Sequence, residues 1–165
     1  MTMIDPNLPG IWIVPGELFT YEVLNDGSYH VAPPAAPLSF SSDAAEMTWG
    51  AQVFDRQSAS ANGAGVEGRW TRRDSTEHWV FSANGQYQVR WGKDDPASTG
   101  IWALRDNGGA LWIREKLAEL TTDGAQVVFN LIGTGPAQYG YTVEDGVWTL
   151  LDPDSWEKRA TYRRP

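Results

Sequence analysis

Four side chains are candidates for acid–base chemistry: Glu77, His78, Arg90 and Tyr141. Histidine titrates near neutral pH and is therefore a common general base, which a carboxylate, a phenol or a guanidinium can assist. Glu77 and His78 are adjacent, but neighbouring residues of a strand point to opposite faces, which argues against a dyad formed by adjacency. His78 as a lone base and His78 as a hydrogen-bonded or solvent-facing residue both stay open.

Other kinds of site lack the residues that they need. The chain has no cysteine, which excludes thiolate nucleophiles, disulfides and thiolate metal sites. It has no G-x-S-x-G motif. Its two histidines, His30 and His78, have no carboxylates at metal-ligand spacing. We therefore expect no metal and no cofactor.

One glycine-rich segment matches a nucleotide-binding pattern. Residues 63–68, GAGVEG, satisfy the dinucleotide fingerprint G-x-G-x-x-G, which requires a strand before it and a helix after it. Here a Ser/Ala-rich segment precedes the pattern, and residues 69–73 have no helical period. We interpret these glycines as part of a linker.

Aromatic residues are the candidates for binding a ligand. The chain has nine Trp, six Tyr and five Phe, and such rings fill a core or line an apolar pocket. Residues 86–91 alternate strictly between polar and apolar, which places Tyr87 and Trp91 on one face, predicted to line the inside of a barrel. Together with Trp79 and Trp112, they are our candidate ligand-binding residues.

The remaining tryptophans have a more structural pattern. Trp12, Trp70, Trp102 and Trp148 each end a G-x-W unit at the start of an expected strand. We therefore predict structural roles for these four. Trp156 lies between acidic residues and is expected to be partly exposed.

Periodicity and turn chemistry predict an all-β fold. Short alternating runs are separated by Asn-Gly and Asp-Gly pairs, which supply the positive φ angles of tight hairpins. We expect strands near residues 10–14, 17–24, 28–32, 38–41, 46–56, 67–73, 76–83, 86–92, 99–105, 110–116, 125–132, 138–143, 147–151 and 158–164. Residues 114–120 contain good helix formers and are equally compatible with an extended segment or one helical turn. The Pro-rich residues 32–37 and the small, polar residues 57–65 are expected to be loops.

The segment that begins at Gly10 is similar to the segment that begins at Gly68. A duplicated strand-and-hairpin unit explains the match, and so does the reuse of one turn chemistry by unrelated hairpins. When the two glycines are aligned, Gly10, Trp12, Gly27, Tyr29 and Val31 coincide with Gly68, Trp70, Gly85, Tyr87 and Val89.

Gly10-Ile11-Trp12 resembles the G-x-W that opens the first barrel strand of lipocalins, which belong to the calycin group. In that family a basic residue of the last strand covers this Trp, a role that the resemblance gives to Arg163 or Arg164. Segments of the last hundred residues also resemble short bacterial lipocalin-like domains. They are Gly68–Trp70, Phe81–Tyr87, Gly100–Trp102, Tyr141–Leu150 and Tyr162–Arg164. The resemblance implies an antiparallel up-and-down β-barrel with extra N-terminal hairpins, and no catalytic residue.

The length of 165 residues favours one domain, residues 1–165. If a boundary exists, we expect it in the linker at residues 57–66. In that alternative, residues 67–165 form the core barrel and residues 1–56 an accessory or duplicated half.

Net charge and targeting signals restrict the partners. The net charge of −8 argues against nucleic acids and anionic membranes. The segment 1–7 lacks the basic and apolar regions of a secretory signal, and no apolar run is long enough to span a membrane. We expect a cytoplasmic protein, and the sequence leaves a homodimer open.

Three functions are compatible with these features. The first is a barrel that binds a small apolar or aromatic molecule. The second is a barrel enzyme that performs acid–base chemistry on a small metabolite. The third is a non-catalytic interaction module that uses the acidic segment 1–65, in which Asp and Glu far outnumber the single Arg.

Overall fold

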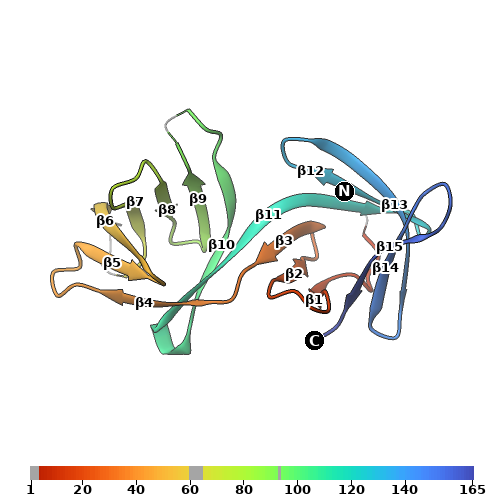
Figure 1. Cartoon of the computed structure of the whole chain (residues 1–165), viewed down its shortest axis with the longest axis horizontal. Helices are drawn as coiled ribbons and strands as arrows, with labels where there is room; N and C mark the ends of the chain where they lie inside the picture. The colour runs from red at the N-terminus through yellow and green to blue at the C-terminus, as the bar shows by residue number, and fades with distance from the viewer. Residues whose placement is uncertain (1–3, 60–64, 93) are drawn as a thin grey trace. The chain divides into compact units, whose positions relative to one another are not determined.

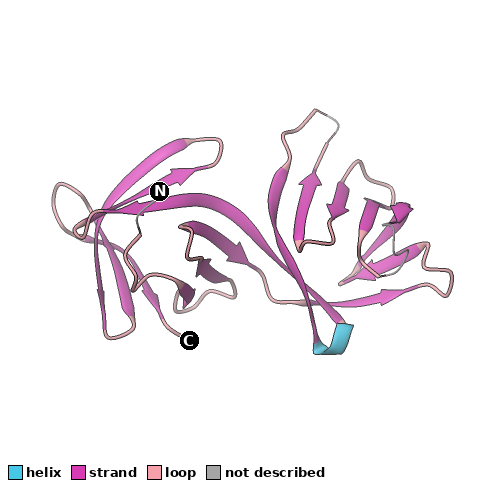
Figure 2. Ribbon diagram, turned by 180° about the vertical axis from the view of Figure 1, so that it is seen from behind, coloured by secondary structure: helices cyan, strands magenta, loops and turns pink. Residues whose placement is uncertain are grey.

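The computed structural model describes residues 4–59, 65–92 and 94–165. Within these residues, the chain forms fifteen strands and one 3-10 helix, η1 (Asp106–Gly108), which joins β10 to β11 (Figure 2). The strands are β1 (Gly10–Ile13), β2 (Thr20–Val23), β3 (Ser28–Ala32), β4 (Ala36–Phe40), β5 (Glu46–Trp49), β6 (Gln52–Ala59), β7 (Gly68–Arg72), β8 (His78–Phe81), β9 (Gln86–Arg90), β10 (Ser98–Arg105), β11 (Ala110–Thr122), β12 (Gln126–Leu131), β13 (Gly135–Glu144), β14 (Val147–Leu151) and β15 (Lys158–Arg163).

The chain divides into two compact units. Unit 1 comprises Met1–Pro33 and Lys116–Pro165, and unit 2 comprises Pro34–Glu115. The long strand β11 therefore contributes its first part, up to Glu115, to unit 2 and the rest to unit 1.

Unit 1 is a closed barrel. Among the described residues, eight strands follow one another in the order β11-β12-β13-β14-β15-β1-β2-β3, and β3 pairs with β11 to close the ring (Figure 1). The connection between β13 and β14 is a tight hairpin in which Asp145 and Gly146 have φ of 51° and 75°, as a two-residue primed turn requires. The predicted fold class, an all-β antiparallel up-and-down barrel, is confirmed; the extra strands, expected as N-terminal hairpins, are β4–β10, because β1–β3 belong to the ring.

The strands outside that ring, together with the first part of β11, form a second closed ring of paired strands in unit 2. They follow the order β4-β5-β6-β7-β8-β9-β10. β10 pairs with β11 from Gly100–Glu115 to Arg105–Ala110, and β11 pairs with β4 at Ala110–Pro37 and Leu111–Ala36. The first part of β11 therefore closes this second ring as its eighth described strand.

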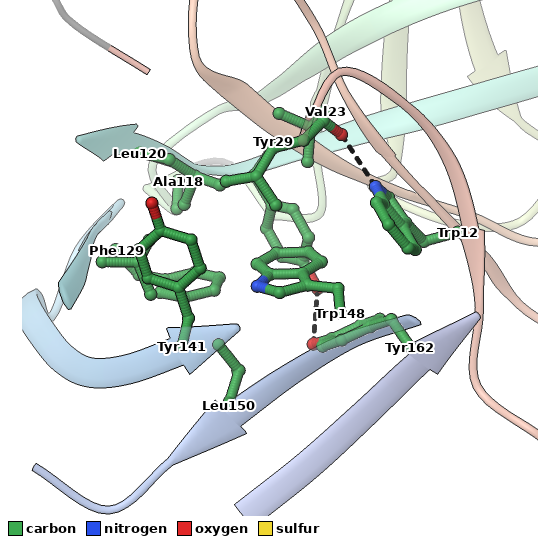
Figure 3. Packing of buried hydrophobic residues seen from close by; sticks show 12 residues of the cluster. Trp12, Val23, Tyr29, Ala118, Leu120, Phe129, Tyr141, Trp148, Leu150 and Tyr162 are labelled. Atoms are coloured by element: carbon green, nitrogen blue, oxygen red, sulfur yellow. Dashed lines mark hydrogen bonds between the residues drawn. The ribbon is translucent and has the colours of Figure 1, made fainter. Parts of the chain in front are cut away.

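Aromatic rings fill the interior of unit 1. Trp148 is fully buried and stacks on Tyr162 at a centroid distance of 4.6 Å and on Phe129 at 6.0 Å. The Tyr29 hydroxyl is 3.0 Å from that of Tyr162 (Figure 3). Unit 2 has its own core, whose larger buried side chains are Met47, Phe54, Trp70, Trp79, Phe81 and Tyr87. Each unit thus has the aromatic core that the high content of Trp, Tyr and Phe predicts.

Trp12, one of the two G-x-W tryptophans of unit 1, is capped at one end of the barrel. The Trp12 indole donates a hydrogen bond to the Leu8 carbonyl at 2.8 Å. The Arg164 guanidinium lies 3.8 Å from the centre of the Trp12 ring. It also donates hydrogen bonds to the carbonyl oxygens of Asn7, Pro9 and Ile11. Of the two arginines that the resemblance offered for this role, Arg164 is the one that covers Trp12.

Unit 2 has an equivalent cap. The Trp70 indole donates to the Val66 carbonyl at 2.8 Å, and the Arg56 guanidinium lies 4.2 Å from the centre of the Trp70 ring. Arg56 also donates to the carbonyl oxygens of Gly65 and Glu67. When Gly68 is aligned with Gly10, these two residues are the counterparts of Asn7 and Pro9. The similarity between the two segments therefore corresponds to a shared three-dimensional arrangement.

Most predicted strands are present, and the differences come from pairing. Residues 46–56 form a hairpin, β5 and β6, rather than one strand, because the chain turns at Gly50, where φ is 60°. Residues 114–120 are all extended within β11. The Pro-rich loop ends early, since Ala36 and Pro37 already belong to β4 and pair with β11.

The linker predicted at residues 57–66 lies inside unit 2. β6 extends to Ala59, residues 60–64 lie outside the described residues, and β6 pairs with β7 on the far side of this segment. The first two residues of the G-x-G-x-x-G match, Gly63 and Ala64, also lie outside the described residues. From Gly68 the chain continues as strand β7, not as the helix that a dinucleotide site needs. The expectation of a single domain, residues 1–165, stays a prediction.

Candidate functional site

Three tryptophans of unit 2 form a continuous row, which we call the tryptophan row: Trp49, Trp79 and Trp91. The Trp49 and Trp79 ring centroids are 5.1 Å apart at an interplanar angle of 83°, and those of Trp79 and Trp91 are 6.0 Å apart at 82°. Edge-to-face contacts of this kind are favourable between aromatic rings. Trp79 is 4% exposed and Trp91 50% exposed, so the row runs from the core of unit 2 to solvent.

Glu77 orients the central member of the row. It is a buried carboxylate, 8% exposed, that accepts a hydrogen bond from the Trp79 indole at 2.7 Å. The Arg72 guanidinium approaches its other oxygen at 3.5 Å. A buried carboxylate is stable only when it is hydrogen-bonded or paired, and here both partners come from the same unit. Glu77 therefore fixes the position of Trp79.

Tyr87 lies against the row and offers a polar group. Its ring centroid is 5.4 Å from that of Trp79, and the residue is 2% exposed. Its hydroxyl forms no hydrogen bond with another described residue. Burial, together with the negative charge of Glu115, raises the pKa of the Tyr87 phenol above its ordinary value, so the phenol stays protonated. It is therefore a neutral donor inside the barrel.

His78 and Arg90 are on the other face of the sheet from Glu77 and Trp79. They are direct cross-strand partners in β8 and β9. The His78 Nδ1 lies 3.2 Å from the Thr71 hydroxyl, and Arg90 donates to the main-chain carbonyl of Asp95 at 2.6 Å. The alternation expected along the strand thus separates His78 from the adjacent Glu77.

The other predicted site residues lie elsewhere. Trp112 follows the core residue Leu111 and points to the opposite face of β11, where its ring lies between the Arg105 and Arg114 guanidinium groups at 4.1 and 4.6 Å. Trp91 follows the end of β9 and is half-exposed. The prediction that Tyr87 faces the inside of the barrel is correct, whereas for Trp91 it is wrong.

Tyr141 belongs to unit 1 and is buried beside a hollow of about 500 Å³. Its hydroxyl donates to the Asp5 carboxylate at 2.9 Å. Burial and this carboxylate raise the pKa of Tyr141 above its ordinary value. Of the four acid–base candidates, Tyr141 is thus in one unit and Glu77, His78 and Arg90 in the other.

The sequence analysis did not select Trp49 as a site residue. The signal was present, because Met47 and Trp49 are two positions apart on a strand and so share a face. Trp156 matches its prediction at 52% exposed, and Trp12, Trp70 and Trp148 are fully buried as expected for structural positions.

Comparisons with protein-family models, curated proteins and solved structures find no match. Among the described residues, no helix is both long and apolar enough to cross a bilayer. The same residues contain no group of three or more His, Asp or Glu that could hold a metal ion.

Proposed function

We propose that this protein binds a small apolar or aromatic molecule against the tryptophan row of unit 2. The observation that carries the proposal is the exposure of Trp91, half of whose surface faces solvent while its ring contacts the buried Trp79. A flat ligand that stacks on Trp91 extends a row of rings that is already in place.

The surroundings of the row fit such a ligand. Small-molecule sites are mostly apolar, with a few polar groups that fix the orientation of the ligand. Trp49, Trp79 and Trp91 supply the apolar surface. The Tyr87 hydroxyl supplies a donor that has no acceptor among the described residues. Glu77 holds Trp79 in place and so reduces the ordering that a ligand must impose.

Two further elements of the proposal rest on the sequence. They are the kinship with lipocalin-like proteins, suggested by Gly10-Ile11-Trp12, and the cytoplasmic location. An eight-strand antiparallel barrel is consistent with the calycin architecture.

A fluorescent probe tests the binding site directly. N-phenyl-1-naphthylamine is neutral, aromatic and brighter in apolar surroundings. Trp91→Ala should weaken its binding about fivefold to tenfold, the effect of one lost aromatic contact. Trp156→Ala is the matched control, because Trp156 is 52% exposed and belongs to unit 1. Equal effects of the two variants, or no binding by the wild type, would contradict the proposal.

A further inference from the structure

A hollow lies in unit 1, beside the Arg164 cap. The hollow of about 500 Å³ is lined by residues 4–7, by residues 122–124 and by Tyr141. Asn7 lines it, and the Asn7 carbonyl also accepts a hydrogen bond from Arg164. The hollow therefore adjoins the capped end of the barrel, and its residues are distinct from those of the tryptophan row.

Asp5 is hydrogen-bonded to other residues that line the hollow. Its main-chain N–H donates to the Thr122 hydroxyl at 2.7 Å. Its carboxylate accepts hydrogen bonds from the Tyr141 hydroxyl at 2.9 Å and from the Asn7 N–H at 2.9 Å. A carboxylate has about four acceptor positions, so each oxygen keeps room for a further donor. The site is thus built by contacts within the protein and retains acceptor capacity.

Asp123 adds a second negative charge to the hollow. One of its oxygens accepts the main-chain N–H groups of Ala125 and Gln126 at 3.0 and 2.7 Å. These hydrogen bonds lower the pKa of Asp123 below its ordinary value. The other oxygen forms no hydrogen bond with a described residue, so it is available to a ligand.

The remaining lining residues decide the charge of the ligand. Among the described residues, the lining of the hollow includes no Lys, Arg or His, so none of these lining residues neutralises either carboxylate. Ile4 and Pro6 supply apolar surface next to the two carboxylates. An anion is repelled here, and a neutral apolar molecule offers no donor to the remaining acceptor positions of the two carboxylates. A cation attached to a short apolar body satisfies both parts of the lining.

We infer that this hollow binds a small organic ammonium ion, whose N–H groups donate to Asp5 and Asp123 while its apolar part lies against Ile4 and Pro6. An ammonium group carries three donors, which suits two carboxylates that line the same hollow. A divalent metal ion is the less suitable occupant, because the described residues contain no group of three ligands for it.

Matched probes separate the charge from the apolar body. Phenethylammonium and 2-phenylethanol have nearly the same size and differ in the charged group. We expect phenethylammonium to bind the full-length protein and to shift the amide NMR signals of residues 4–7 and 122–124. We expect 2-phenylethanol to bind at least about tenfold more weakly, the ratio that one hydrogen bond to a charged group gives.

Conservative variants locate the site. Asp5→Asn and Asp123→Asn keep the size of the side chain and should each weaken phenethylammonium binding about fivefold to tenfold. Asp154→Asn removes the same charge from an exposed turn of unit 1 and should leave binding unchanged. Equal binding of the two probes, an equal loss in Asp154→Asn, signal shifts elsewhere only, or competition by Mg²⁺ or Ca²⁺ would overturn the inference. Because Trp91→Ala does not alter this hollow, this result and the test of the tryptophan row are independent.

Discussion

At the scale of single residues, an arginine covers a G-x-W tryptophan in each unit. The Arg164 guanidinium stacks on Trp12 and donates to three main-chain carbonyl oxygens. A planar guanidinium can do both because its donors lie in the plane of the group while its face lies on the ring. Lysine has a compact charge and no such plane, so Arg164 is the residue type that this position requires.

Replacing this arginine should destabilise unit 1. Arg164→Ala removes the contact with Trp12 and leaves the carbonyl oxygens of Asn7, Pro9 and Ile11 without their donor. We expect the free energy of unfolding to fall by about 2 kcal/mol, measured by urea denaturation. Arg164→Lys should recover part of this loss.

The neighbouring arginine is the matched control. Arg163 is exposed on β15, and Arg163→Ala should change the free energy of unfolding by no more than about 0.5 kcal/mol. If both alanine variants were equally destabilised, net charge rather than the cap over Trp12 would be responsible.

At the scale of elements, β10 depends on the absence of a side chain at Gly100. A Cβ atom there would lie 2.2 Å from the Arg114 carbonyl oxygen and 2.6 Å from the Tyr87 ring. The first of these atoms belongs to the main chain of the adjacent strand and cannot rotate away. The glycine of this G-x-W unit is therefore required by close approach of its neighbours, not by an unusual φ angle.

We expect Gly100→Ala to lower the free energy of unfolding by about 1–3 kcal/mol, as overpacking of a buried site does. Urea denaturation measures the loss, and tyrosine absorbance reports the displacement of Tyr87. Thr99→Ala is the control, because Thr99 is exposed on the same strand. A Gly100→Ala variant as stable as Thr99→Ala would show that β10 and β11 separate easily at this point.

Residues 114–120 show how pairing overrides local preference. Arg, Glu, Lys, Leu and Ala are good helix formers, yet the segment is a strand. Ala118 and Leu120 are fully buried on one face while Glu119 is exposed on the other. Both buried residues pair with β12, at Leu131 and Phe129. Two-residue alternation and an available partner strand decide the conformation here, and only the first of these is visible in the sequence.

At the scale of the whole molecule, both units draw strands from both sides of residues 60–64. Unit 1 takes β1–β3 from before this segment and β12–β15 from after it. Unit 2 takes β4–β6 from before it and β7–β10 from after it. A cut between Ala59 and Gly65 therefore separates no complete unit from the rest of the chain.

A protease recognition sequence inserted between Ala59 and Gly65 tests this organisation. After cleavage, we expect the two fragments to stay together in native mass spectrometry and size-exclusion chromatography, and to separate only in urea. The hydrogen bonds and buried side chains that join them are those of the two barrels. Fragments that separate in native buffer would contradict the pairing of β15 with β1 and of β6 with β7.

The sequence predicted much of the fold because strands and turns are local. Residues 28–32 and 147–151 are strands with the predicted bounds, since alternation and Gly-containing turns specify them without reference to partners. The candidate site was predicted only in part. Alternation placed Tyr87 correctly, but it could not show that β9 ends at Arg90 and leaves Trp91 half-exposed.

By itself, the sequence determined the β class, most strand positions and the structural positions of the G-x-W tryptophans Trp12, Trp70 and Trp148, because each depends on residues close together in the chain. Only the tertiary structure decided which arginine covers which tryptophan. Arg164 comes from the opposite end of the chain to Trp12, whereas Arg56 comes shortly before Trp70. The two caps have the same geometry but opposite chain order, so no spacing in the sequence relates them. In the barrel of unit 1, β1 pairs with β15, so residues from the two ends of the chain meet. This pairing exists only in the folded sheet.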